Sequence, residues 1–114
     1  MAPRKEDLDG DQDGELGVVT EKKTKRPRLY KVLLHNDHYT TMEFVVAILK
    51  EVFHKSESDA VTVMLHVHRN GYGVAGVYSR EIAETRTQKA MALAREAEYP
   101  LLVTVEPEEI DGGE

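Results

Sequence analysis

The first cluster of hydrophobic residues covers residues 29–35. It is a short apolar run with the β-branched Val32 at its centre, and such runs predict a strand that is buried on at least one face. Asn36 and Asp37 follow directly, and both residue types favour turns. The pattern therefore predicts one strand that ends in a turn.

Beyond this turn, the hydrophobic spacing changes to that of a helix. Thr40 precedes Glu43 by three residues, which is the spacing of a capping box at a helix N-terminus. We therefore expect a helix over residues 41–54 with Thr40 at its cap. The apolar residues that recur at helical intervals are Met42, Val45, Val46, Leu49, Val52 and Phe53.

A second helical pattern follows, and Ser56 together with Asp59 is typical of its N-terminus. Asn70 and Gly71 are typical of a helix C-terminus. These signals predict a second helix that ends just before Gly71. Its apolar face, at positions i, i+3, i+4 and i+7, is formed by Val61, Met64, Leu65 and His68.

The remaining chain predicts a strand, a helix and a strand. Residues 74–78 have the composition of a strand, Ser79 can cap the helix that follows, and Pro100 ends it. Residues 101–106 alternate between apolar and other side chains, which predicts a strand with one buried face. The face of the helix is formed by Ile82, Ala90, Leu93, Ala94 and Ala97, and that of the last strand by Leu101, Val103 and Val105.

The predicted order is β-α-α-β-α-β, which favours an α+β fold with a small sheet and helices packed on one side. A length of 114 residues allows one domain. The chain has no cysteine, which excludes disulfides, cysteine-ligated zinc and thiol catalysis. No apolar run is long enough for a transmembrane helix and the N-terminus does not resemble a signal peptide, so we expect a cytoplasmic protein without a membrane partner.

The net charge of −6 is distributed unevenly. Residues 1–16 carry six acidic and two basic side chains, whereas residues 17–28 carry one acidic and five basic ones. The start of the chain has too few large apolar residues to bury a core. We therefore expect a disordered arm over residues 1–27, a folded domain over 28–106 and an acidic tail over 107–114.

The basic part of the arm offers an alternative function, because clustered cations can bind nucleic acid or an acidic partner. A solvated linker is the simpler interpretation. A nearly neutral folded domain with an acidic tail also argues against a nucleic-acid partner. The basic side chains are Lys22, Lys23, Lys25, Arg26 and Arg28.

An enzyme is not expected, because the chain has neither a glycine-rich phosphate loop nor a G-x-S-x-G motif. The histidines raise the possibility of a metal-dependent hydrolase. His35 and His38 are three positions apart, but His66 and His68 are two apart on a predicted helix and so point about 200° away from each other. We therefore expect no metal and no other cofactor.

A more informative group is Asn36, Asp37 and His38, taken together with His68. The first two are commonly turn formers, and a lone histidine on an apolar helix face is commonly a partly buried core residue. Yet an amide oxygen, a carboxylate and a neutral imidazole can all accept hydrogen bonds from an ammonium group. A small amine with an apolar side chain, lined by adaptable methionines, is one of several possibilities that the pattern leaves open.

Three segments resemble the ClpS family of adaptors, which hand N-degron proteins to the Clp ATPase–protease. The resemblance covers residues 28–106. It is carried, in order along the chain, by LYKVLLHNDHYTTMEFV, VMLHVHRNGYGVAGVY, and EIAETRTQKA with YPLLVTVE. It implies a three-stranded antiparallel sheet with three helices on one face. It also implies a non-enzymatic, monomeric adaptor that binds a bulky N-terminal residue (Phe, Tyr, Trp or Leu) and delivers the protein to a ClpA-type unfoldase.

The resemblance also implies which residues carry these roles. The α-amino group would be held by Asn36, Asp37, His38 and His68. The side-chain pocket would be lined by Leu34, Thr40, Met42, Val45, Met64, Leu65 and Val67, with Met42 as a gate against β-branched residues. The surface that docks on the N-terminal domain of the ATPase would include Glu81, Glu84, Thr85 and Arg86. The arm would engage the unfoldase.

Two positions depart from the family pattern. The usual turn is Asn-Asp-Asp, whereas His38 occupies its third position here, where an amine-binding carboxylate is common. The usual Tyr-Thr-Pro-Met has Thr41 in place of proline, which should be a mild change. Because of the first departure, whether His38 contributes to amine binding is the main question that the sequence leaves open.

Overall fold

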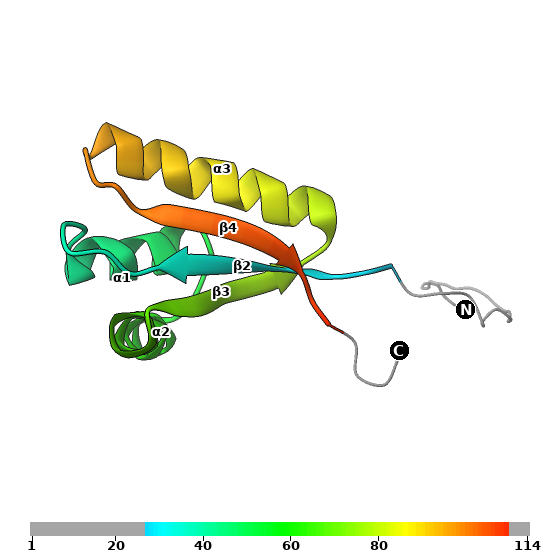
Figure 1. The fold of residues 1–114 in the computed structure, drawn as a ribbon, viewed down its shortest axis with the longest axis horizontal. Coiled ribbons are helices and arrows are strands. Elements are labelled where there is room, and N and C mark those ends of the chain that lie inside the picture. Colours follow the sequence, from blue (N-terminus) through cyan, green and yellow to red (C-terminus); the bar gives the residue numbers. More distant parts are fainter. Residues whose placement is uncertain (1–26, 110–114) are drawn as a thin grey trace, which may run out of the picture.

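The computed structural model describes residues 27–109. The expected arm therefore lies outside the described residues except for Pro27, and so does the end of the expected tail. The elements are β2 (Tyr30–His35), α1 (Met42–Glu51), α2 (Glu57–Asn70), β3 (Tyr72–Tyr78), α3 (Arg80–Glu96) and β4 (Leu102–Pro107) (Figure 1). This order confirms the predicted β-α-α-β-α-β sequence of elements. β4 extends to Pro107, one residue into the range expected to be tail.

The three strands form one antiparallel sheet in the order β3-β2-β4. The central strand β2 carries the continuous apolar run, and its residues Val32, Leu33 and Leu34 are all buried. Leu34 lies opposite Gly73 of β3 and Val103 of β4, on the face where the helices pack. In Figure 1, α3 runs along β4 and α2 lies beside β3. The α+β fold with helices on one face of the sheet is confirmed.

The first helix begins differently from the prediction. Thr41, not Thr40, is its N-cap, and the Thr41 hydroxyl accepts a hydrogen bond from the backbone N–H of Phe44 at 3.1 Å. Thr40 is not available as a cap because its own N–H and hydroxyl both donate to Asp37. The helix ends at Glu51, three residues before the predicted boundary.

The second helix has the predicted ends. The Ser56 hydroxyl accepts from the backbone N–H of Asp59, and Gly71 closes the helix with a left-handed φ of 92°, which glycine adopts without strain. The predicted buried face is wrong, since Ala60 and Val67 are the buried residues. The predicted face is only partly buried at Met64 and is exposed at His68, because it lies at the edge of the helix contact.

The third helix packs through small side chains. Its buried residues Ala83, Thr87, Ala90 and Ala94 let α3 lie close to the sheet. Ile82, predicted to be buried, is 45% exposed, and Ala97, also placed on that face, is exposed. A close contact with the sheet leaves no room for a side chain as large as isoleucine, so the alanine positions form the buried stripe instead.

Candidate functional site

A hollow of about 530 Å³ opens between the turn after β2, the start of α1 and the second half of α2. Its polar side chains come mainly from the turn, and its apolar side chains come from the two helices. It brings together most of the residues predicted to bind an amine and an apolar side chain. The lining residues are Asn36, Asp37, His38, Thr40, Thr41, Met42, Val45, Met64, Val67 and His68.

Asp37 organises the turn. Its Oδ1 accepts from the backbone N–H groups of Tyr39 and Thr40, both at 2.7 Å, and its Oδ2 accepts from the Thr40 hydroxyl at 2.8 Å. A carboxylate has about four acceptor positions, so one position, on Oδ2, is left for a further donor. Asp37 is thus both a turn former and a candidate acceptor for an amine.

The charge of Asp37 is stabilised by the same contacts. Partial burial raises the pKa of this carboxyl, but the hydrogen bonds from Thr40 and Tyr39, together with the nearby His38, outweigh that effect and lower the pKa below its usual 3.8. Asp37 is therefore an anion at neutral pH. The hollow presents one fixed negative charge from this turn to a cation.

A backbone hydrogen bond fixes the turn against the end of α2. The N–H of Asn36 donates to the carbonyl of Gly71 at 2.9 Å. This bond holds the turn beside the last turn of α2, which carries His68. Gly73 permits the close approach, since a Cβ there would lie 2.8 Å from Cγ2 of Val67. Asn36, Asp37 and His68, far apart in the sequence, are thus held around one hollow.

The apolar part of the hollow has an exposed and a buried end. Met42 is 44% exposed, whereas Val67 is 2% exposed. Met42 therefore lies at the mouth and Val67 at the base, with Val45 and Met64 between the two helices. An unbranched, flexible side chain at the mouth can adapt to the shape of an occupant.

Two residues predicted to line the side-chain pocket, Leu34 and Leu65, are not among those that line this hollow. Leu34 is fully buried in the core beneath the helices. Leu65 points away because it follows Met64 by about 100° around the helix and lies about 160° from Val67. Thr41, which does line the hollow, was missed because Thr40 was taken as the cap. Asp37 three residues before Thr40 is the signal that could have shown that Thr40 belongs to the turn.

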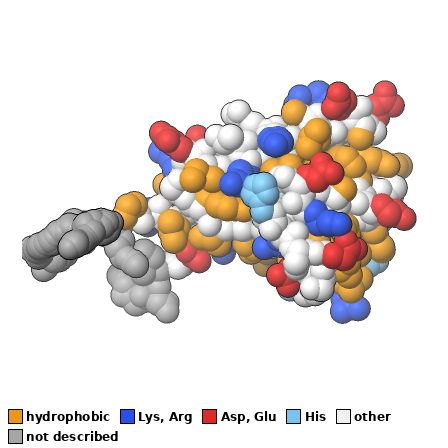
Figure 2. Space-filling view, turned by 180° about the vertical axis from the view of Figure 1, so that it is seen from behind, with side chains coloured by type: hydrophobic (Ala, Val, Ile, Leu, Met, Phe, Trp, Pro, Cys, Tyr) orange, Lys and Arg blue, Asp and Glu red, His pale blue; other side chains and the backbone are white. Residues whose placement is uncertain are grey.

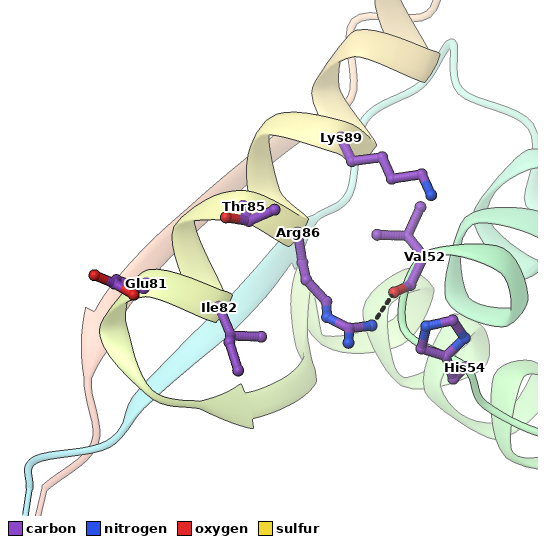
Figure 3. A pocket seen from close by; sticks show the side chains of 7 residues that line it. All are labelled: Val52, His54, Glu81, Ile82, Thr85, Arg86 and Lys89. Carbon is purple, nitrogen blue, oxygen red and sulfur yellow. Dashed lines mark hydrogen bonds between the residues drawn. The ribbon is translucent and has the colours of Figure 1, made fainter.

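The surface predicted to dock on an ATPase lies on the N-terminal half of α3. Glu81, Thr85 and Arg86 line a second hollow of about 410 Å³ (Figure 3). Glu84 does not line it, and its carboxylate pairs with Arg80 at 3.3 Å. The other lining residues, which the sequence did not point to, are Val52, His54, Ile82 and Lys89. The exposed Ile82, one large apolar residue among charged ones, was the available signal.

Arg86 is held rigidly in this second hollow. Its Nη1 donates to the carbonyl of Val52 at 2.6 Å, and its guanidinium carbon lies 5.1 Å from the centre of the Tyr78 ring. Burial raises the pKa of Tyr78, while the charge of Arg86 partly opposes the shift, so the ring stays neutral beneath the cation. Figure 3 shows Arg86 and Lys89 extending from α3 toward the end of α1, near His54.

Figure 2 shows the face of the molecule that is turned away from the viewer in Figure 1. In Figure 2, hydrophobic side chains emerge between charged ones, and basic side chains lie beside a histidine.

Within residues 27–109, no group of three or more histidine and acidic side chains is arranged to hold a metal ion. None of the helices described is long and apolar enough to cross a membrane.

Comparisons with known proteins agree on one family. The family described as "ATP-dependent Clp protease adaptor protein ClpS" matches residues 25–104. The ClpS adapter of Myxococcus xanthus is 64% identical over 96 residues, which cover 81% of this chain and 90% of the relative. That of Maricaulis maris is 50% identical over 109 residues, covering 95% of this chain and 100% of the relative.

A solved structure extends the comparison to the fold. It is that of Agrobacterium tumefaciens ClpS2 bound to L-phenylalaninamide. The two chains are 51% identical with a TM-score of 0.70, and the match covers 73% of this chain and 100% of the other. The sequence and the three-dimensional arrangement therefore point to the same family.

Proposed function

This chain belongs to the ClpS family of ATP-dependent Clp protease adaptors, and we propose that the hollow beside Asp37 binds the N-terminal residue of proteins destined for degradation. The observation that supports this proposal most directly is the arrangement of the hollow. A carboxylate with a lowered pKa and one acceptor position left stands beside apolar walls. A free α-amino group next to a large apolar side chain matches both features.

The amine would be bound by three kinds of acceptor. An ammonium group has three donors. Asp37, Asn36 and His68 have side chains that can accept hydrogen bonds, and they line the same hollow together with His38. Hydrogen bonds to a charged group contribute about 1.5–3 kcal/mol each. The free N-terminus is therefore the feature that separates a substrate from an internal segment of any protein.

The side chain would be bound between Met42, Val45, Met64 and Val67. A hollow of about 530 Å³ is large enough for Phe, Tyr, Trp or Leu. The Agrobacterium relative supports this assignment, because L-phenylalaninamide combines a free amine, a benzyl side chain and an amide where a peptide would continue. We infer the same class of ligand for this chain.

The docking of the adaptor on a ClpA-type ATPase is assigned to the N-terminal half of α3. Glu81, Thr85 and Arg86 are close together there, and Arg86 is fixed in one geometry by Val52 and Tyr78. A fixed guanidinium loses less conformational freedom on binding than a mobile one, which favours an interface. The adaptor would hold its cargo in one hollow while it contacts the N-terminal domain of the ATPase through the other.

The decisive experiment compares a peptide that begins with Phe with the same peptide acetylated at its N-terminus. Acetylation removes the charge and two of the three donors, so we expect at least tenfold weaker binding by fluorescence anisotropy. A peptide with Phe only at an internal position is the second control. Equal affinity for the free and the acetylated peptide would disprove amine recognition.

A further inference from the structure

A groove of about 480 Å³ lies beside the proposed substrate hollow, between α1 and α2. Met42 and Met64 line both cavities, so their side chains form a common wall. The sequence pattern did not single out this groove. Its lining residues are Met42, Glu43, Val46, Ala47, Lys50, Glu57, Val61 and Met64.

The groove has a direction and a length. Along α1 it extends from Met42 to Lys50, a distance of about 12 Å at the helical rise of about 1.5 Å per residue. At its far end, Lys50 Nζ lies 2.5 Å from a carboxylate oxygen of Glu57 and closes the groove. An extended peptide advances by about 3.3 Å per residue, so the groove can hold three to four residues.

We propose that this groove binds an apolar side chain at the third position of the substrate. The inference rests on the proposed function, which places the first side chain in the hollow on the other side of Met42 and Met64. In an extended chain, residues one and three point to the same side and lie about 6.6 Å apart, while residue two points away. The third side chain is therefore the one directed into the groove.

The chemistry of the lining favours an apolar occupant. Val46, Ala47 and Val61 provide the apolar wall, together with the two shared methionines. The charged lining consists of two carboxylates and one ammonium, and the ammonium of Lys50 is engaged by Glu57. An acidic third residue would meet the remaining negative charge of Glu43. Leu, Ile and Met are thus favoured, and Asp and Glu are disfavoured.

The test uses the full chain and four peptides that differ only at positions two and three after an N-terminal Phe. We expect Phe-Ala-Leu to bind about fivefold more tightly than Phe-Ala-Ala, because a partly buried leucine gains part of its transfer free energy. Phe-Leu-Ala should bind like Phe-Ala-Ala, and Phe-Ala-Asp should bind more weakly. Titration calorimetry or anisotropy measures all four affinities.

A groove variant distinguishes this site from general hydrophobicity of the peptide. Val61→Gln places an amide in the groove and should abolish the gain from Leu at position three while leaving the affinity for Phe-Ala-Ala unchanged. Thr62→Gln is the matched control, because Thr62 is exposed at the neighbouring position of α2 and does not line the groove. This control should retain the gain.

Each outcome bears on the proposal separately from the function. Binding of Phe-Ala-Ala that is lost on acetylation supports the proposed function whatever happens at position three. If Leu at position three then gives no gain, or if the gain appears only at position two, the groove proposal is wrong. A gain that persists in Val61→Gln would likewise overturn it, since the leucine would then be bound elsewhere.

Discussion

Replacing Asp37 should separate two roles that the structure gives to one carboxylate. Asp37→Asn keeps the size of the side chain and one oxygen acceptor but removes the charge. Asp37→Ala also removes the acceptors for Tyr39, for the backbone of Thr40 and for its hydroxyl. The first variant tests the binding of an amine, and the second tests the turn as well.

The expected magnitudes follow from these contacts. Loss of side-chain acceptors for backbone N–H groups at a comparable helix cap costs about 0.5–2 kcal/mol. For a domain of this size, about 1 kcal/mol corresponds to a shift in Tm of roughly 4–8 °C. We therefore expect Asp37→Ala to lower Tm by about 2–16 °C and Asp37→Asn to lower it by less. Loss of a charged hydrogen bond should weaken binding of a Phe peptide by about 1.5–3 kcal/mol in both variants, which is more than tenfold.

The pH dependence of stability has a definite sign. Because the folded protein lowers the pKa of Asp37, the ionised carboxylate stabilises the fold above the unfolded value of about 3.8, and this contribution is lost as the pH falls through the lower folded pKa. Thermal unfolding at pH 7 and at pH 3 should therefore show a smaller difference in Asp37→Asn than in the wild type.

The assay combines thermal unfolding with peptide binding, and Thr40→Val is the control. This variant removes only the hydroxyl donor to Oδ2 and leaves the charge in place. It should lose some stability and, because Thr40 also lines the hollow, it should lose clearly less affinity for the peptide than Asp37→Asn does. If Asp37→Asn is destabilised and still binds the Phe peptide as tightly as the wild type, Asp37 is a turn former alone and its assignment as an amine acceptor is refuted.

Three further substitutions test the remaining parts of the site. His68→Ala should weaken binding of the Phe peptide about tenfold in an anisotropy assay. The control is His66→Ala, which should have no effect because His66 is exposed on the same helix and does not line the hollow. Equal losses of affinity in the two variants would contradict a specific role of His68. Met42→Ala should narrow the difference in affinity between peptides that begin with Phe and those that begin with the branched residues Ile and Val, because apolar pockets discriminate by only about 1–3 kcal/mol per such change. If the order of affinities is unchanged, Met42 is a packing residue and not a gate. His38→Asp should tighten binding of the Phe peptide at pH 7 and reduce the loss of affinity between pH 8 and pH 6, because a protonated imidazole repels the ammonium and a carboxylate attracts it. If calorimetry gives the same pH dependence of affinity and no gain in affinity at pH 7, His38 faces solvent.

The parts of the fold that could be predicted are those fixed by local patterns. The apolar run around Val32 and Leu34 predicted a strand, which proved to be the central one, because Val32, Leu33 and Leu34 are all buried in the structure. Gly71 marked the end of α2 because only a residue that tolerates positive φ fits there. In both cases the residues of one short segment were enough to predict the structure of that segment.

The predictions failed where side-chain hydrogen bonds or packing between elements, rather than periodicity, decide the structure. In the sequence Thr40 is the better cap because it has Glu43 three residues later, yet Thr41 is the cap because the carboxylate of Asp37 binds Thr40. Ile82 is the largest apolar residue at the start of its helix, yet the close packing of α3 on the sheet selects the alanines. The hollow joins a turn and the end of α2 through one backbone bond from Asn36 to Gly71, which no periodicity could show.

The first helix sets the separation between the two hollows. Its N-terminal residue Met42 borders the proposed substrate hollow, while Val52 at its C-cap borders the hollow on the α3 side. The ten residues of α1 act as a rigid spacer of about 15 Å between the two. If cargo and ATPase bind these two hollows as proposed, occupation of one leaves the other open, and adaptor, cargo and ATPase could form a ternary complex. In such a complex docking alone would not expel the cargo, and its transfer would need a further step.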